Sequence, residues 1–139
     1  MSISAYLDNV AKPFMNLSPW LLRLSLGTSF ILHGLGKFPM PADGMVKLFE
    51  NKGILFPELT ASLVALGEVG AGAGIIVGGL INNNTGTLIT RLSGGAVVVI
   101  MIGALLIAHP DWLITQKLFM SEQIFLLALG TYFAIRGNN

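Results

Sequence analysis

Four long apolar segments, separated by shorter polar stretches, set the pattern of the chain. They cover roughly residues 19–36, 58–81, 92–109 and 118–136. An α-helix needs about 20 mainly apolar residues to cross the hydrocarbon layer of a membrane. The pattern therefore predicts an all-α membrane protein whose four transmembrane helices form a bundle.

Residues that favour helix ends stand at the borders of these segments. Ser18 and Pro19 suit the cap and the first position of a helix, and Pro57 opens the second segment in the same way. Three asparagines at 82–84 follow the second segment, and Pro110 stops the third. The borders thus agree with the four predicted spans.

The stretch between the first two spans is too polar to cross a membrane. Within it, Met45, Val46, Leu48 and Phe49 recur at helical spacing. This spacing predicts a short amphipathic helix that lies at the membrane interface between helices 1 and 2. The residues before Ser18 lack the apolar core and cleavage site of a signal peptide, so we expect them to form a short interfacial segment.

Glycines recur inside the second and third spans. Small residues at such spacing let two membrane helices approach closely, and we favour close packing within the bundle over a dimer motif. The glycines concerned are Gly70, Gly74, Gly78, Gly94, Gly95 and Gly103.

Composition narrows the possible functions. Of the 139 residues, 53% are hydrophobic and only 11% are charged, whereas about 25% are charged in an ordinary soluble domain. The eight basic and seven acidic residues are scattered singly, which excludes the basic surface of a nucleic-acid-binding protein. No stretch has the composition of a linker, so residues 1–139 are expected to form one domain.

The chain contains no cysteine. Disulfides, thiolate metal sites and iron–sulfur ligation by this chain are therefore excluded. In a redox reaction, the electrons would have to be carried by a quinone, a bound cofactor or a partner.

Two charges fall deep inside the predicted spans. A charge at the centre of a membrane helix costs about 2.5–3.5 kcal/mol, so it needs a partner or a water-filled cavity. Counting about 1.5 Å per residue from the helix ends places Arg23 and Glu68 within reach of each other. We therefore predict a buried Arg23–Glu68 ion pair, which is either functional or a structural clamp.

With four spans, both termini lie on one side of the membrane, and the opposite side is called the loop side here. The same counting places His33, His109 and Glu122 at one level near the loop side, on three different helices. Lys37, Trp112 and Lys117 lie close to the same rim. Trp112 with Phe119 would wall an apolar pocket for a ring-shaped ligand.

These residues also have structural explanations. His33 can cap the end of its helix, His109 can be an interfacial residue, and Trp112 can anchor the chain at the membrane surface. Arg91 stays open between a headgroup contact and a functional role. The cations best suited to lipid headgroups are Lys37, Lys117 and Arg136.

Several motifs resemble those of the DoxX-like family of small bacterial membrane proteins. They are RLSLGTSFILHGLGK at 23–37, FENKGILFPEL at 49–59, LGEVGAGAGIIVGG at 66–79 and LITRL at 88–92. The resemblance implies a multi-pass four-helix bundle in the bacterial cytoplasmic membrane, associated with respiratory redox chemistry. The family includes the quinone-linked small subunit of thiosulfate:quinone oxidoreductase. The polar positions that look like those of the family pattern are Arg23, His33, Lys37, Glu68, Arg91, His109 and Glu122.

Three functions remain open from the sequence. The first is a quinone-interacting subunit of a membrane oxidoreductase, in which His33, His109 or Glu122 exchanges protons with the quinone oxygens. The second is a non-catalytic accessory subunit of a larger membrane complex or homo-oligomer, in which the charges hold the helices in register. The third is a small-molecule or proton-coupled transporter, against which the chain shows no inverted repeat.

A haem or non-haem metal site built from His33, His109 and Glu122 is not expected. Two imidazoles and one carboxylate are a ligand set that iron and zinc use. The three residues come from separate helices, however, and no local ligand spacing supports such a site.

Overall fold

The computed structural model describes residues 1–139 and contains helices and no strand. Two of the helices, α4 and α5, are long and apolar enough to cross a membrane. The all-α prediction is confirmed by the absence of strands. Of the four predicted spans, two have the length and apolarity of a membrane-crossing helix. In chain order the helices are α1 (Ile3–Ala11), α2 (Ser18–Leu35), α3 (Asp43–Asn51), α4 (Pro57–Leu80), α5 (Asn84–Ile107), α6 (Gln116–Met120) and α7 (Glu122–Arg136), with 3-10 turns at Lys12–Phe14 and Pro110–Trp112.

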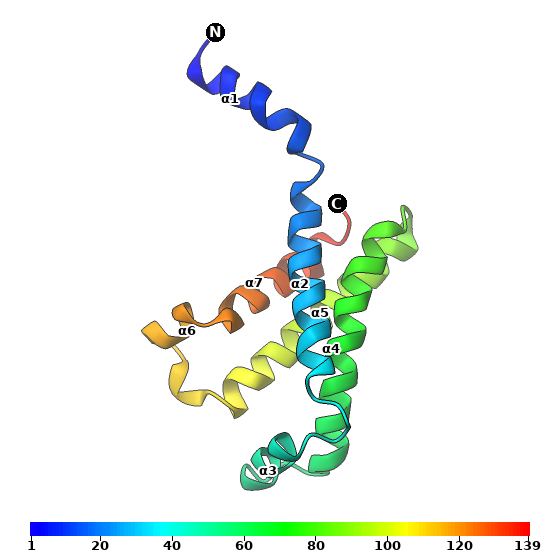
Figure 1. Cartoon of the computed structure of the whole chain (residues 1–139), viewed down its shortest axis with the longest axis vertical. Coiled ribbons are helices and arrows are strands. Elements are labelled where there is room, and N and C mark those ends of the chain that lie inside the picture. The colour runs from blue at the N-terminus through cyan, green and yellow to red at the C-terminus, as the bar shows by residue number, and fades with distance from the viewer.

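The four longest helices pack in chain order, α2 on α4, α4 on α5 and α5 on α7. Successive helices of this series run in opposite directions (Figure 1). α5 and α7 lean away from α2 and α4, so the two helix pairs separate toward the end of the molecule where α3 lies (Figure 1). α1 extends beyond the bundle at the opposite end.

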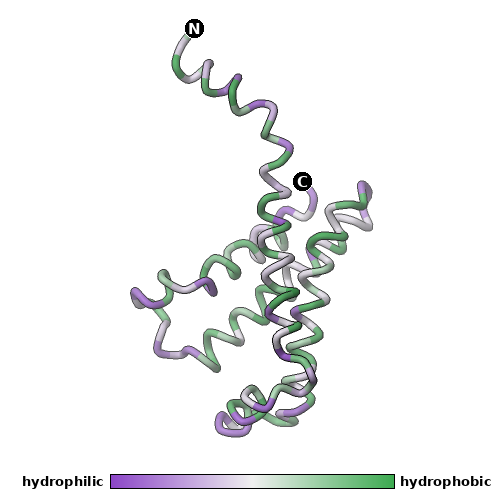
Figure 2. The backbone as a smooth tube through the Cα atoms, in the orientation of Figure 1, coloured by the Kyte–Doolittle hydropathy of each residue, from purple (hydrophilic) through white to green (hydrophobic).

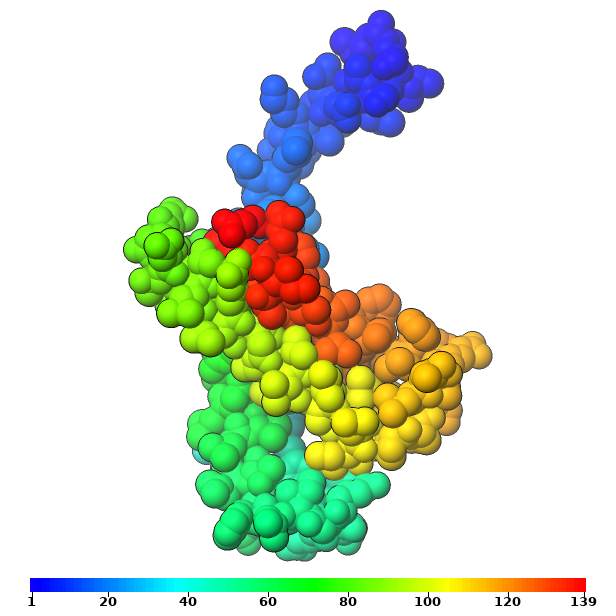
Figure 3. Space-filling model, turned by 180° about the vertical axis from the view of Figure 1, so that it is seen from behind, coloured from blue at the N-terminus to red at the C-terminus, as the bar shows by residue number.

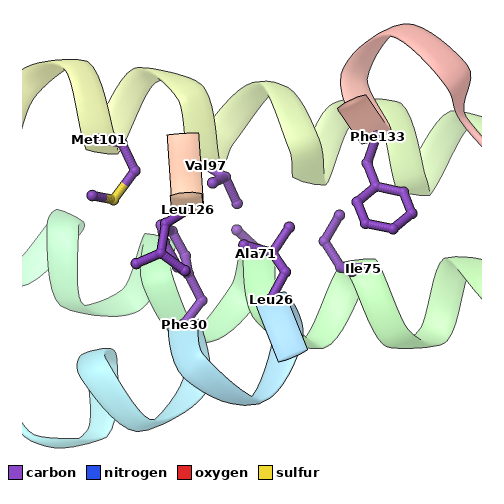
Figure 4. Close-up of a cluster of buried hydrophobic side chains, with 8 residues drawn as sticks. All are labelled: Leu26, Phe30, Ala71, Ile75, Val97, Met101, Leu126 and Phe133. Carbon is purple, nitrogen blue, oxygen red and sulfur yellow. The ribbon is translucent and has the colours of Figure 1, made fainter. Parts of the chain in front are cut away.

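The core lies where all four helices meet. Each helix contributes two buried side chains, which point toward one another in Figure 4: Leu26, Phe30, Ala71, Ile75, Val97, Met101, Leu126 and Phe133. Each of the same helices exposes large apolar side chains, for example Leu21, Leu63, Leu92 and Phe125. Many of the polar residues lie at the helix ends and in the connections (Figure 2). This distribution suits lipid around the bundle, where association depends on close packing rather than on the hydrophobic effect.

Glycines set the register of α2 against α4. A Cβ on Gly27 would lie 2.9 Å from the carbonyl oxygen of Gly72, and one on Gly34 would lie 2.8 Å from that of Ala65. Real Cβ atoms do not approach so closely, so the two backbones touch at positions that admit only glycine. The sequence pattern missed Gly72 as a contact of this kind.

The predicted glycine contacts are confirmed at some positions only. Gly74 and Gly78 pack against Ser93 and Thr90 of α5, and Gly94 packs against α7. Gly70, Gly95 and Gly103 face open space instead. The predicted glycine spacing of four residues therefore makes helix contacts only at Gly74 and Gly78, in the last two turns of α4.

Two helix boundaries differ from the prediction. α5 begins at Asn84 rather than near residue 92, because the Asn83 side chain caps it by accepting from the backbone N–H groups of Thr85 (2.9 Å) and Gly86 (3.3 Å). The last apolar segment is broken at Ser121, whose extended backbone separates α6 from α7. The short helix predicted around Met45–Phe49 is present as α3, and its Phe49 is buried.

Candidate functional site

The predicted Arg23–Glu68 ion pair does not form. Arg23 Nη1 donates to the backbone carbonyl of Ile75 (2.6 Å), two turns along α4 from Glu68, which pairs with Lys37 instead. The prediction assumed that the loop-side ends of α2 and α4 lie at one depth. Since the end of α2 packs beside Ala65, the first two turns of α4 extend beyond it. Depths counted from the two helix ends are therefore offset.

Lys37 follows the end of α2 and reaches across to α4. Its Nζ lies 2.7 Å from Glu68 Oε2 and also donates to the backbone carbonyl of His33 at 3.2 Å. That carbonyl belongs to the last turn of α2, which has no helical N–H partner for it and carries the negative end of the helix dipole. Lys37 thus compensates the buried Glu68 carboxylate and caps α2. The prediction that Lys37 contacts lipid headgroups is wrong, because its Nζ is bound inside the bundle.

His33 and Glu122 form the second ion-pair contact of this end of the bundle. His33 Nε2 lies 2.9 Å from Glu122 Oε1, at the first residue of α7. The other ring nitrogen, Nδ1, lies 2.7 Å from the backbone carbonyl of Ser29, one turn earlier in α2. The prediction that His33 and Glu122 share a level is confirmed, although α2 and α7 touch only over a short region.

A cavity of about 410 Å³ opens between the separated helix pairs. Four titratable side chains face it: His33, Lys37, Glu68 and His109. Most of its other walls are apolar, with Phe30 from α2, Phe49 from α3, Met101 from α5 and Leu126 from α7. Figure 3 shows the surface hollowed between α4 and the second half of α5. An apolar pocket with a few convergent polar groups is the usual form of a small-molecule site.

The aromatic residues that were predicted to wall the pocket, Trp112 and Phe119, do not line the cavity. His109 follows α5, faces the cavity and stacks on Trp112, with ring centroids 3.7 Å apart and planes 12° from parallel. Trp112 therefore stands behind His109 rather than on the cavity wall. Phe119 is 65% exposed on α6 and does not line the cavity either. The aromatic walls are Phe30 and Phe49 instead.

The other predicted cations lie away from the cavity. Lys117 is exposed and lies 4.0 Å from Asp111, a surface ion pair of little energetic weight. Arg91 is exposed on α5, two turns inside the helix, and passes close to Gly137. Arg136 is exposed and its Nε donates to the backbone carbonyl of Asn139 (3.1 Å). None of the three cations contacts the His33–Glu122 pair or the Lys37–Glu68 pair.

Arg23 occupies a separate polar corner at the other end of the bundle. Besides Ile75, its guanidinium donates to the hydroxyl of Thr90 (3.1 Å) and to the side-chain oxygen of Asn138. The Asn138 amide nitrogen donates to the carbonyls of Gly78 (2.8 Å) and Ile81 (3.3 Å) at the end of α4. The corner joins α2, α4, α5 and the segment after α7.

All the acceptors around Arg23 are neutral. The cation lies near the last turns of α4, where the helix dipole is negative, and its guanidinium carbon lies 4.9 Å from the ring centre of Phe133. These contacts hold Arg23 without a carboxylate partner. Thr90 and Asn138 were not predicted from the sequence, because single uncharged polar residues give no pattern that distinguishes them.

The comparisons place the chain among known families. The family model described as DoxX matches residues 18–110, which is more than half of the chain. The match runs from the start of α2 to the beginning of the 3-10 turn after α5, and it includes Arg23, His33, Lys37, Glu68 and His109. Neither the search of curated proteins nor that of solved structures found a match.

Proposed function

The chain belongs to the DoxX family, and on that premise we propose that it is a quinone-interacting small subunit of a membrane-bound respiratory oxidoreductase. It would lie in the bacterial cytoplasmic membrane with four spans. The observation that carries the proposal is the cavity of about 410 Å³, whose walls are mainly apolar and whose polar groups are His33, Lys37, Glu68 and His109.

The lining of the cavity fits the chemistry of a quinone head. A quinone is a flat ring whose two carbonyl oxygens accept hydrogen bonds and whose body is apolar. Phe30, Phe49 and Met101 offer apolar contact to such a ring, while His33 and His109 carry ring nitrogens that can donate. The volume lies within the range of about 300–1,000 Å³ that is usual for small-molecule pockets.

The chain itself would bind the quinone and manage protons. The quinone supplies two-electron redox chemistry, and a partner or a bound cofactor would deliver the electrons, because the chain has no cysteine thiol to carry them. Glu68 and Lys37 neutralise each other at 2.7 Å. They therefore keep the polar end of the cavity close to neutral, which suits an uncharged ligand.

A four-span arrangement is supported by the outward faces of α2 and α7. Both helices expose large apolar side chains that suit contact with lipid: Leu21, Leu24, Leu32, Phe125 and Ile135. At about 1.5 Å per residue, the 15 residues of α7 span about 22 Å. α7 alone is therefore short for a bilayer, and in a four-span arrangement α6 would complete the last span.

The test is to purify the protein from native membranes in mild detergent and to extract and quantify bound quinone. Wild type and an exposed control, Glu58→Gln in the first turn of α4, should retain quinone in stoichiometric amount. His33→Gln should retain much less. Folded wild-type protein that carries no quinone, and that binds no added short-chain ubiquinone, would overturn the proposal.

A non-catalytic accessory subunit is the second candidate, and the Arg23 corner favours it. Arg23 is 5% exposed and donates to three neutral acceptors, on α4, on α5 and after α7, so it acts as a clamp between these segments. If the same purification yields a defined larger complex without quinone on this chain, the accessory function replaces the first proposal.

A further inference from the structure

The geometry of two hydrogen bonds points to His33 and Glu122 as a single-proton relay between the loop-side surface and the cavity. We infer that His33 Nε2 and Glu122 Oε1 share one exchangeable proton, that His33 passes it to the cavity only through Nε2, and that Glu122 replenishes it. The inference rests on the proposed function for the identity of the cavity's occupant. The relay itself follows from the arrangement of this chain's own atoms.

The backbone of α2 fixes one side of the His33 ring. Nδ1 lies 2.7 Å from the carbonyl oxygen of Ser29, and a carbonyl oxygen can only accept a hydrogen bond. Nδ1 must therefore carry a hydrogen in every protonation state that keeps this contact. The Ser29 hydroxyl is farther away, at 3.4 Å. Proton exchange by His33 is thereby restricted to Nε2.

The other side of the ring shares a proton with Glu122. The 2.9 Å contact between Nε2 and Oε1 needs one hydrogen between the two atoms. Either His33 is an imidazolium beside a carboxylate, or it is neutral beside a carboxylic acid. The two forms differ only in the position of one proton, so the pair stores one proton and can release it from either end.

The two partners stand on different sides of the cavity wall. The His33 side chain is 39% exposed and lines the cavity, whereas the Glu122 side chain is 60% exposed and does not line it. The next residue of α7, Gln123, does face the cavity. Glu122 is thus the outer member of the pair, at the loop-side end of the bundle, and His33 is the inner member.

The other charged groups near His33 are already engaged. Glu68 of α4 pairs with Lys37, which also binds the His33 carbonyl, and His109 beyond α5 stacks on Trp112 across the cavity. In the Lys37–Glu68 pair, an ammonium donates to a carboxylate at 2.7 Å, so each charge is compensated by the other. The proton between His33 and Glu122 is consequently the mobile one at this end of the bundle.

Transfer proceeds by exchange of partners at Nε2. The acceptor is a negatively charged oxygen of the quinone after the electron donor has reduced it: this oxygen replaces Glu122 Oε1 at Nε2, the Nε2–H bond breaks and an O–H bond forms. This leaves His33 neutral with its hydrogen on Nδ1. Glu122 then takes up a proton from hydronium in the solvent, which leaves water, passes a proton to Nε2 and becomes a carboxylate again. No electron moves in these steps, and the atoms balance.

The chain's two histidines make the relay directly observable. Protein labelled with ¹⁵N only at histidine should give four ring-nitrogen resonances, and His109→Gln assigns those of His33. In lipid nanodiscs, we expect His33 Nδ1 to stay protonated over the whole pH range in which the protein is folded, while Nε2 changes. Addition of short-chain ubiquinone should shift Nε2 and leave Nδ1 in place.

Glu122→Gln is the test variant, and Glu58→Gln is the control because Glu58 is exposed and lies outside the cavity. Glu122→Gln should shift the Nε2 resonance. It should also change how this resonance depends on pH, because the carboxylate that shares the proton is gone. Glu58→Gln should change neither. Equilibrium dialysis with the same ubiquinone measures binding separately. A His33 that carries its hydrogen on Nε2 with a bare Nδ1 would overturn the relay.

Binding and relay can fail independently. If ubiquinone binds by dialysis while Nε2 does not respond, the relay is wrong and the proposed function survives. If ubiquinone does not bind, the proposed function fails. The relay is then supported by a protonated Nδ1 together with an Nε2 that responds to Glu122→Gln, and it is overturned if either is missing.

Discussion

Lys37 and Glu68 form an ion pair of 2.7 Å that joins the end of α2 to the middle of α4, and the glycine contacts between the two helices make it possible. Because Gly34 packs between Ala65 and Val69, the last turn of α2 comes level with Glu68, and the Lys37 side chain turns back along α2 to reach it. One carboxylate in the apolar part of α4 thereby gains a cation from the neighbouring connection. The functional end of the bundle thus depends on helix register.

Breaking the Lys37–Glu68 pair from one side should destabilise the protein more than removing both charges. Lys37→Met leaves a carboxylate that is 9% exposed without its cation, and we expect it to lower the free energy of unfolding by about 3 kcal/mol. The double variant Lys37→Met with Glu68→Gln should recover most of that loss. Reversible unfolding in detergent micelles measures all the variants. Additive losses in the double variant would contradict a coupled pair.

The close approach of α2 and α4 is testable at one glycine, with a neighbouring glycine as control. A Cβ on Gly72 would lie 2.6 Å from the carbonyl oxygen of Gly27, whereas one on Gly70 would meet nothing within 4 Å. Gly72→Ala should therefore destabilise the bundle by about 1–3 kcal/mol through overpacking. Gly70→Ala should be neutral or stabilising by up to about 1 kcal/mol, because alanine favours helix. Equal losses for both would show that helix packing is not the cause.

Sequence reasoning reached the helical class, α3 and the shared level of His33 and Glu122, because apolar runs and residue counting carry that information. It failed for Arg23 and Glu68, since counting from helix ends requires the ends to be level, and α4 extends beyond α2. Register depends on which glycines touch, and a run such as 70, 72, 74 and 78 does not say which of them faces which helix. The apolar pocket was expected with Trp112 and Phe119 as its walls, and these walls were wrong for a related reason, because the separation of two helix pairs is a property of tertiary packing.

Asn138 should be a strong stabiliser of the Arg23 corner although it lies outside the helices. Its amide makes four hydrogen bonds, to Arg23, Thr90 and the carbonyls of Gly78 and Ile81. Asn138→Ala leaves buried donors and acceptors unpaired, which costs about 1–3 kcal/mol for each group left unsatisfied. Asn139→Ala is the control, because the contact of Asn139 is made by its backbone carbonyl. Thermal unfolding compares the two variants, and equal melting temperatures would show that the Asn138 side chain does not stabilise the fold.

Filling the cavity should abolish ligand binding without disturbing the fold, and two glycines of α5 allow a matched comparison. Gly103 lines the cavity and Gly95 does not, yet a Cβ at either position would meet no atom within 4 Å. Gly103→Leu should occupy cavity volume and weaken binding of short-chain ubiquinone at least tenfold, which corresponds to about 1.4 kcal/mol. Gly95→Leu should bind as wild type, because its side chain lies outside the cavity. Both variants gain helix propensity and should unfold at or above the wild-type temperature. If Gly103→Leu remains folded and binds ubiquinone as tightly as Gly95→Leu, the quinone does not occupy this cavity, and the His33–Glu122 pair must serve another ligand.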